Sequence, residues 1–322
     1  MKTDMTTSQT VQVSRRRFLT SSAIAAVGMC FAPRRMFAEG ESPVTVIRGQ
    51  AATAKITVTK LRRNVSVLEG SGGNIAVLTG KDGKLLVDAG ITASRPRITD
   101  ALESLSSDPL KHLINTHWHF DHTDGNEWLH SMGAEITAHE NTRKHLSETT
   151  RVDAWNFTFP PSPPGALPTG LVKQDRQLHV NGTTLALKHY APAHTDSDLS
   201  VEFTDADILH VGDTWWNGYF PFIDYNTGGS IDGAIRAAEA NVANVTDKTI
   251  VIPGHGPVGD KTGLIEFRDM LVAVRDKVAT LKKQGKSLDE TVAAKPTAAY
   301  DDKWGGFVID GKTFTALVYT GV

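Results

Sequence analysis

The stretch His117-Trp118-His119-Phe120-Asp121-His122 decides the fold, because it places three imidazoles and one carboxylate within six positions. It directly follows an apolar segment, residues 112–115, that is typical of a strand. In an extended backbone, residues two apart point to the same side, so His117 and His119 can bind one ion together. Asp121 and His122 are adjacent and cannot both face that ion without a turn. The simplest arrangement directs them to a second ion, and imidazole and carboxylate ligands suit zinc.

Three further candidate ligands lie later in the chain, each just after a predicted strand. His194 follows residues 190–193, and Asp213 follows the apolar stretch 208–212. His255 lies in Pro253-Gly254-His255-Gly256-Pro257, where the glycines permit a tight turn that brings backbone close to a site. None of the three would indicate a site alone. The remaining histidines are interpreted as structural or solvated residues: His112, His130, His139, His145, His179, His189 and His210.

Composition excludes several classes of protein. The chain has 322 residues, 40% hydrophobic and 22% charged, which indicates a globular protein of one large or two modest domains. Residues 1–38 hold six basic residues and one acidic residue, which leaves 28 basic and 35 acidic residues and a formal charge of −7 for the rest. Such an acidic body argues against nucleic acid as a partner. The single cysteine, Cys30, lies in the N-terminal segment, so the body has no disulfide, cysteine ligand or cysteine nucleophile.

The N-terminal segment has the pattern of a targeting signal. Arg15-Arg16 is followed by Phe18-Leu19 and then by a short, mostly small or apolar stretch, residues 20–32. That stretch is too short for a stable membrane span, which needs about 20 residues. The segment resembles a bacterial twin-arginine export signal. The resemblance implies the twin-arginine export machinery as a partner and a periplasmic or secreted location.

The apolar pattern of the body predicts strands followed by helices in both halves, which favours two sheets packed together with helices outside. Strands are expected at 55–59, 74–78, 85–87, 112–115 and 134–138, and then at 199–203, 208–211, 249–252 and in a hairpin at 178–190. Helices are expected at 97–105, 126–132, 141–148, 230–245 and 262–284. The proline-rich segment 157–170 is expected to be a stiff loop, either a surface connector or a lid.

The ordered set His-x-His-x-Asp-His, His, Asp and Gly-His-Gly resembles the metallo-β-lactamase-fold superfamily over roughly residues 55–285. The resemblance implies an α+β fold, a four-layer αβ/βα sandwich of two mixed β-sheets flanked by helices. The implied domains are a signal at 1–38, a linker at 39–54 and a catalytic domain at 55–322. Two zinc ions per chain are implied as cofactors. Their implied ligands are His117, His119 and His194 for one ion, Asp121, His122 and His255 for the other, and Asp213 as a bridge.

The resemblance also implies a reaction. A hydroxide that bridges two metals would attack an ester, lactone, thioester or amide, including a β-lactam, of a small-molecule substrate. His117, His119 and Asp121 are the implied catalytic residues, with Asp121 orienting the hydroxide. Asp88 and Thr116 are candidates to fix the ligand rings from behind.

Asp213 and the aromatic residues after it indicate which class of substrate to expect. Two subclasses of true β-lactamases have cysteine where this chain has Asp213, and the third generally lacks that aspartate. The resemblance therefore favours glyoxalase II-like thioesterases, lactonases and related esterases. Lys282, Lys283 and Lys286 could mimic the basic glutathione-binding region of glyoxalase II but are interpreted as a solvated helix end. We expect a pocket wall for an apolar acyl chain or ring from the aromatic run that contains Trp215, Trp216, Tyr219, Phe220 and Phe222.

Two alternatives from other classes stay open. One is a mononuclear iron oxidoreductase of the persulfide dioxygenase type, with iron held by His117, His194 and Asp213. The complete second set of ligands makes a single iron the weaker hypothesis. The other is a non-catalytic periplasmic zinc-binding protein, which would have no need of an open coordination position. The oligomeric state cannot be derived from these patterns.

Overall fold

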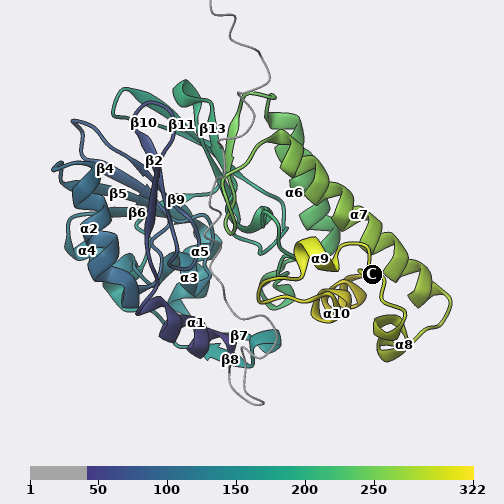
Figure 1. Ribbon diagram of the computed structural model, residues 1–322. Helices are drawn as coiled ribbons and strands as arrows, with labels where there is room; N and C mark the ends of the chain where they lie inside the picture. The colour runs from purple at the N-terminus through teal and green to yellow at the C-terminus, as the bar shows by residue number, and fades with distance from the viewer. Residues whose placement is uncertain (1–41) are drawn as a thin grey trace, which may run out of the picture.

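The computed structural model describes residues 42–322, and the predicted export signal at 1–38 lies outside them. Two β-sheets pack face to face, with helices on the outer side of each (Figure 1). The expected α+β sandwich of two mixed sheets flanked by helices is therefore confirmed. No helix among residues 42–322 has the length and apolar character needed to cross a lipid bilayer.

The first sheet has seven strands in the order β1-β2-β3-β4-β5-β6-β9. Strands β1 to β4 are antiparallel neighbours, whereas β4, β5, β6 and β9 run parallel. Their bounds are β1 Thr57–Lys60, β2 Val65–Glu69, β3 Ile75–Leu78, β4 Lys84–Val87, β5 Leu110–Ile114, β6 Glu135–His139 and β9 Gly170–Val172. Helices α2 (Arg95–Leu105) and α4 (Asn126–Ser131) cover the outer face of this sheet.

The second sheet has five strands, β10 (Arg176–Val180), β11 (Thr183–His189), β12 (Leu199–Phe203), β13 (Ile208–His210) and β14 (Ile250–Ile252). The predicted hairpin is confirmed: Asn181 and Gly182 join β10 to β11 with positive φ angles of 54° and 72°. Such angles suit a two-residue turn that matches the twist of the strands. Helices α6 (Ile231–Asn244) and α7 (Lys261–Lys283) cover the outer face.

The core between the sheets explains why the strands read as continuous apolar runs. Leu85 and Val87 of β4 face the second sheet, where they pack in one cluster with Leu187 and Phe203. Leu86 points the opposite way, toward the helices on the outer face. Since successive strand residues alternate sides and both sides are covered, every position of β4 is buried.

The segment expected as a linker, residues 39–54, contains a helix. Helix α1 spans Pro43–Ala51. Ser42 caps it by accepting a hydrogen bond from the backbone N–H of Val44, and Pro43 occupies the first turn, where its missing N–H costs nothing. The fully buried side chain of Val44 joins the cluster of apolar residues around α6 and α7.

Two more regions differ from the expectations. The segment around residues 150–159 forms a small hairpin of β7 (Thr150–Val152) and β8 (Phe157–Phe159) ahead of the prolines. At the C-terminus, three helices follow α7: α8 (Leu288–Ala293), α9 (Asp301–Trp304) and α10 (Gly311–Gly321). Helix α10 packs on α7, and Phe314 stacks on Phe220 with 4.8 Å between the ring centroids. Two short helices, α3 (Phe120–Thr123) and α5 (Glu140–Ser147), complete the first half.

Candidate metal centre

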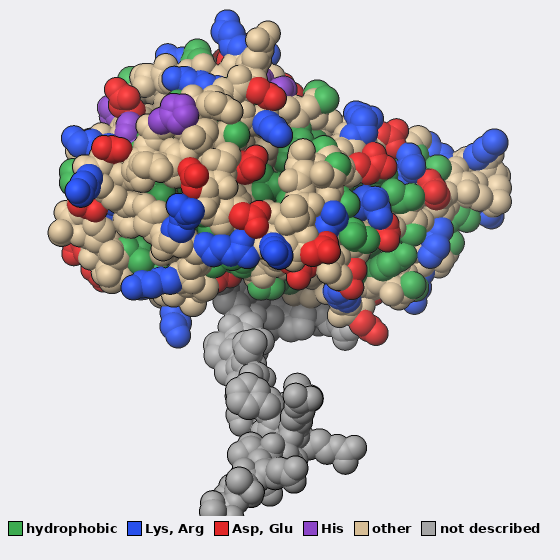
Figure 2. All heavy atoms as spheres, turned by 90° about the horizontal axis from the view of Figure 1, so that it is seen from above, with side chains coloured by type: hydrophobic (Ala, Val, Ile, Leu, Met, Phe, Trp, Pro, Cys, Tyr) green, Lys and Arg blue, Asp and Glu red, His purple; other side chains and the backbone are tan. Residues whose placement is uncertain are grey.

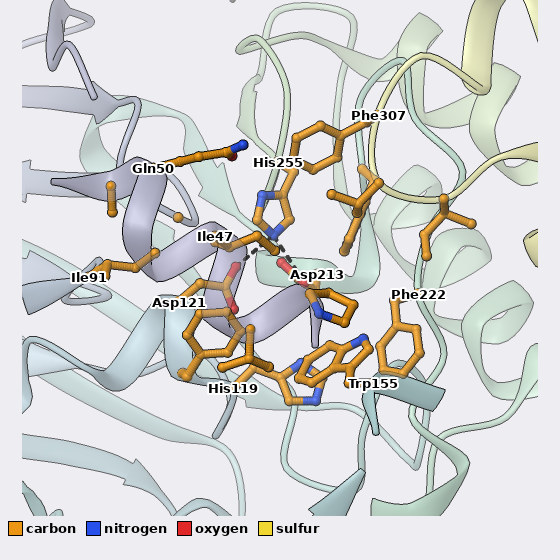
Figure 3. A pocket seen from close by; sticks show the side chains of 18 of the residues that line it. Ile47, Gln50, Ile91, His119, Asp121, Trp155, Asp213, Phe222, His255 and Phe307 are labelled. Carbon is orange, nitrogen blue, oxygen red and sulfur yellow. Dashed lines mark ion pairs between the residues drawn. The ribbon is translucent and has the colours of Figure 1, made fainter. Parts of the chain in front are cut away.

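The seven candidate ligands meet at one edge of the sandwich. They lie in the segments that follow β5, β11, β13 and β14, so the strand ends bring together positions up to 138 residues apart, from His117 to His255. Six of the seven side chains are buried, and Asp121 is half-buried. Figure 3 shows His255 pointing at the carboxylates of Asp121 and Asp213.

The ligands form two groups, each with donor atoms within 4.8 Å of one another. One consists of His117, His119, His194 and Asp213, and the other of Asp121, His122 and His255. Within residues 117–122, a change from extended to helical backbone after His119 directs the side chains on either side of it to different places. His119 is extended, with φ −58° and ψ 148°, and helix α3 begins at the next residue. Asp121 and His122 therefore point to a different place from the two histidines before them.

Asp213 lies between the groups. Its Oδ2 is 3.3 Å from Nε2 of His194 and 3.8 Å from Nε2 of His117 in the first group. The same oxygen is 3.4 Å from Nε2 of His255, and Oδ1 is 3.1 Å from Nε2 of His122 in the second. One carboxylate thus faces ligands of both groups.

Asp88 and Thr116 hold two of the rings from behind, as the sequence predicts. Asp88 Oδ2 lies 2.8 Å from Nδ1 of His122 and accepts a hydrogen bond of 2.8 Å from the hydroxyl of Thr116. That hydroxyl oxygen is 3.1 Å from Nδ1 of His117. Because both Nδ1 atoms are engaged, His117 and His122 present Nε2 to the centre of the site.

Asp224 is a site residue that the sequence analysis missed. Its buried Oδ2 lies 3.0 Å from Nε2 of His119 and accepts a hydrogen bond of 2.7 Å from the hydroxyl of Thr227. His119 therefore turns its other nitrogen, Nδ1, to the site, where it is 2.9 Å from Nε2 of His194. The signal in the sequence is slight: one carboxylate directly after the apolar residues Phe222-Ile223.

Buried polar atoms without hydrogen-bond partners indicate that these residues fit a metal centre. Nε2 of His117, Nε2 of His122 and Oδ1 of Asp213 are buried without a hydrogen-bond partner. Buried polar atoms without partners are rare in native proteins because each costs free energy. Here they converge on the space between the two groups, where cations would satisfy them. Five imidazoles and two carboxylates are a donor set that suits zinc.

The histidines of the two ligand groups differ in pKa. Burial lowers the pKa of His117 well below its ordinary value, which keeps that ring neutral. Burial opposes the charge of His255 as well, but the carboxylates of Asp213 and Asp121 outweigh it and raise its pKa to about 9. The pKa of His122 is raised well above its ordinary value by Asp213, Asp121 and Asp88, again against the effect of burial. Metal binding to these two rings must therefore displace protons.

Glycines allow the backbone to approach the ligands closely. A Cβ atom on Gly254 would lie 1.9 Å from Oδ1 of Asp213, and one on Gly73 would lie 2.1 Å from Cε1 of His122. The backbone N–H of Gly254 donates to the carbonyl of Gly212, 2.7 Å away, which ties the loop of His255 to that of Asp213. The tight approach expected at residues 253–257 is confirmed.

A cavity of about 590 Å³ opens beside the two groups. Asp121, Asp213, His119 and His255 lie in its wall, so a small molecule can reach the ligands from this side (Figure 3). Of the aromatic run expected to form the wall, Trp216 and Phe222 line the cavity. Trp215 does not: it is fully buried in the core against Gly259 and Gly263. Tyr219 packs on Phe307 behind the wall, with ring centroids 4.8 Å apart.

Substituting Gly254→Ala tests the glycine approach. The added methyl group has to displace the carboxylate of Asp213, so we expect metal affinity to fall by roughly 10- to 100-fold, the scale seen when ligand orientation is lost. The measurement is competition with a chromophoric chelator. Gly49→Ala is the matched control, because a Cβ there meets nothing within 4 Å. Equal affinity of the two variants would contradict the geometry.

Substituting Asp224→Ala tests the partner of His119. With no acceptor for Nε2, the ring loses its fixed orientation, and metal affinity should fall by roughly 10- to 100-fold. Asp224→Asn keeps an acceptor oxygen and should recover part of that loss. If both variants lose affinity and thermal stability to the same degree, Asp224 supports the loop and does not orient the ring.

Comparisons with known proteins agree on a family. The sequence model of the Metallo-beta-lactamase superfamily matches residues 68–258. The chain is 26% identical over 196 residues to "Probable metallo-hydrolase MJ0888" of Methanocaldococcus jannaschii, covering 60% of this chain and 91% of that protein. It is 23% identical over 193 residues to "Probable metallo-hydrolase YqgX" of Bacillus subtilis, covering 58% and 86%.

Solved structures show the same fold. The stereoselective inverting sec-alkylsulfatase Pisa1 from Pseudomonas sp. superposes with a TM-score of 0.62 at 16% identity, over 85% of this chain. This chain spans only about half of the sulfatase, 51%. A metallo-beta-lactamase from Pontibacter korlensis has a TM-score of 0.55 at 19% identity, covering 68% of this chain and 99% of that one. With a family match over more than half of its length, and with the ligand geometry described above, the chain belongs to the metallo-beta-lactamase superfamily and is related to metallo-hydrolases.

Proposed function

We propose that the protein is a dinuclear zinc hydrolase that cleaves an ester, lactone, thioester or amide bond, β-lactams included. The observation that supports this most is the arrangement of seven ligands in two groups that share Asp213. A single metal would leave the second group, Asp121, His122 and His255, without a purpose. The open cavity beside the ligands favours catalysis over storage of a metal, because it admits a substrate to them.

In the proposed hydrolysis, each residue of the site has a separate role. Zinc ions bound here would acidify a water molecule and polarise the carbonyl oxygen of the substrate. Asp121 lies in the cavity wall, where its carboxylate can orient the attacking water and hold its proton. Asp88 and Asp224 keep His122 and His119 in place during the reaction. The water oxygen adds to the acyl carbon, and the bond from that carbon to oxygen, sulfur or nitrogen breaks. The proton held by Asp121 passes to the atom released, which leaves in a linear substrate and stays attached to the opened ring in a lactone or β-lactam.

Glutathione thioesters are the weaker choice among these substrates. The basic residues at the end of α7 are engaged away from the cavity: Lys282 donates to the carbonyl oxygens of Tyr319 and Val322, and Lys286 pairs with Glu290 at 3.1 Å. None of these residues lines the cavity. Lys282 thereby joins the end of α7 to α10, whereas Lys286 pairs with a residue of α8.

Metal content is the first measurement that tests the proposal. Elemental analysis of the purified chain should give close to two zinc ions per molecule, and chelation should abolish hydrolysis of lactone, ester, thioester and β-lactam substrates. His119→Ala should lose metal and activity together, whereas His179→Ala, an exposed histidine on β10, should lose neither.

Three outcomes would overturn this function. One iron per chain would favour the persulfide dioxygenase type of oxidoreductase. Two zinc ions without turnover of any substrate would favour a zinc-binding protein. A His119→Ala variant with two metals and full turnover would contradict the ligand assignment.

We also propose that the twin-arginine machinery exports the protein to the periplasm or beyond. The support is the sequence Ser14-Arg15-Arg16-Arg17-Phe18-Leu19. Export of a folded protein suits an enzyme that takes up its metal before transport.

The charge on the surface argues against nucleic acid as a partner. Figure 2 shows Lys and Arg interspersed with Asp and Glu over one face, without the continuous basic stripe that tracks a phosphate backbone.

Conservative substitution of the arginine pair tests the export route. Arg15→Lys combined with Arg16→Lys preserves charge but removes the address that the export receptor reads, so the protein should accumulate in the cytoplasm. Arg17→Lys is the matched control and should be exported. Fractionation of bacterial cells with an antibody to the chain provides the measurement. Normal export of the double variant would exclude this route.

A further inference from the structure

The cavity has walls that the catalytic family does not supply. The family match covers residues 68–258, whereas much of the cavity wall comes from residues 43–55 and 307–317. We propose that these two segments bind an uncharged alkyl or acyl chain of the substrate, so that the enzyme hydrolyses apolar esters or lactones. This inference rests on the proposed function and names its substrate class.

Helix α1 forms the first wall. Val44, Ile47 and Ala51 line the cavity from this helix, and Figure 3 shows Ile47 above Asp121 and His119. The helix is fastened at three points. Its cap residue Ser42 donates to the carbonyl of Trp155 at 2.8 Å, Arg48 pairs with Asp124 at 2.9 Å, and the hydroxyl of Ser94 donates to the carbonyl of Ala51 at 2.6 Å. These contacts make α1 a fixed surface against which a flexible chain can pack.

The C-terminal segment forms a second wall. Phe307, Val308, Ile309 and Leu317 all line the cavity. The ring of Phe307 lies 5.9 Å from that of His255 and 6.0 Å from that of Trp216, so the apolar surface reaches the second ligand group. The segment is anchored by α10, whose Phe314 is fully buried.

Aromatic rings extend the apolar surface to the first ligand group. Trp155, from the loop between β7 and β8, stacks on Phe222 with ring centroids 4.7 Å apart and an angle of 30°. The same indole lies 4.7 Å from the ring of His119. An apolar chain bound on these surfaces therefore begins directly beside the atoms where the bond is cleaved.

Charge in the cavity favours a neutral substrate. Among the residues that line it, the only lysine or arginine is Lys55, which is exposed. Arg48 of α1 is not part of the wall and is paired with Asp124. Outside the ligand groups, an additional anionic group of the substrate would therefore meet no buried Lys or Arg side chain in the wall. This argues for esters and lactones over alkyl sulfates and glutathione thioesters.

A series of substrates that differ only in chain length tests the inference. The full chain, loaded with zinc, is assayed on 4-nitrophenyl esters and γ-lactones with side chains of two to twelve carbons. We expect kcat/KM to rise roughly threefold to fourfold per methylene until the cavity is filled. Sodium alkyl sulfates of the same lengths should be hydrolysed far more slowly. A flat or falling series, or a preference for the sulfates, would overturn the inference while leaving the hydrolase intact.

Binding to the metal-free protein separates the inference from the proposed function. Calorimetry with N-methyl decanamide, a neutral alkyl probe, should detect binding with a negative heat-capacity change, as burial of apolar surface requires. Ile47→Asn and Val308→Asn should each weaken that binding by tenfold or more. Thr45→Asn, on the exposed side of α1, is the matched control and should bind like the parent protein. Absence of binding to the parent protein would overturn the inference even if esters are hydrolysed.

Discussion

The carboxylate of Asp213 is the constraint on which the rest of the site depends. It is buried among four imidazoles, with its two oxygens directed at ligands of both groups. Such a concentration of polar atoms is costly inside a protein unless cations neutralise and bind it. The fold supplies this environment because β13 ends at His210, and the turn that follows carries Asp213 to the sheet edge. Glycine at position 254 leaves the space that the carboxylate needs.

The ends of several strands position the ligands at one edge of the sandwich. Strands β5, β13 and β14 end at the same edge, so each following loop can contribute a ligand without a long excursion of the chain. A second layer of carboxylates, Asp88 and Asp224, then fixes which nitrogen of a ring faces the centre. Asp88 contacts a ligand of the second group, and Asp224 contacts a ligand of the first. The β-sheets on which the loops are built hold the donor atoms of each group within 4.8 Å of one another.

The candidate ligands and most of the cavity wall come from different parts of the chain. The ligands lie within residues 117–255, inside the span that matches the superfamily. Helix α1 and the segment after α9 lie outside that span and form apolar walls on either side of the ligands. In a fold that hosts many functions, such a division lets the walls differ while the ligand geometry stays the same.

The residue pattern alone predicts a metal site and the type of fold, because metal binding requires particular residue types at close spacing and the strands require an apolar pattern. His117 to His122 and the residues 253–257 could be interpreted without coordinates for that reason. The cavity, in contrast, depends on how distant segments of the chain pack together. Trp215 and Trp216 are neighbours in the sequence, yet one lies in the core and the other in the wall, because consecutive side chains point in different directions. Asp224 meets His119 across 105 positions, and α1 meets the cavity opposite residues 307–317. Contacts between segments so far apart depend on how the layers pack, and no local pattern encodes them.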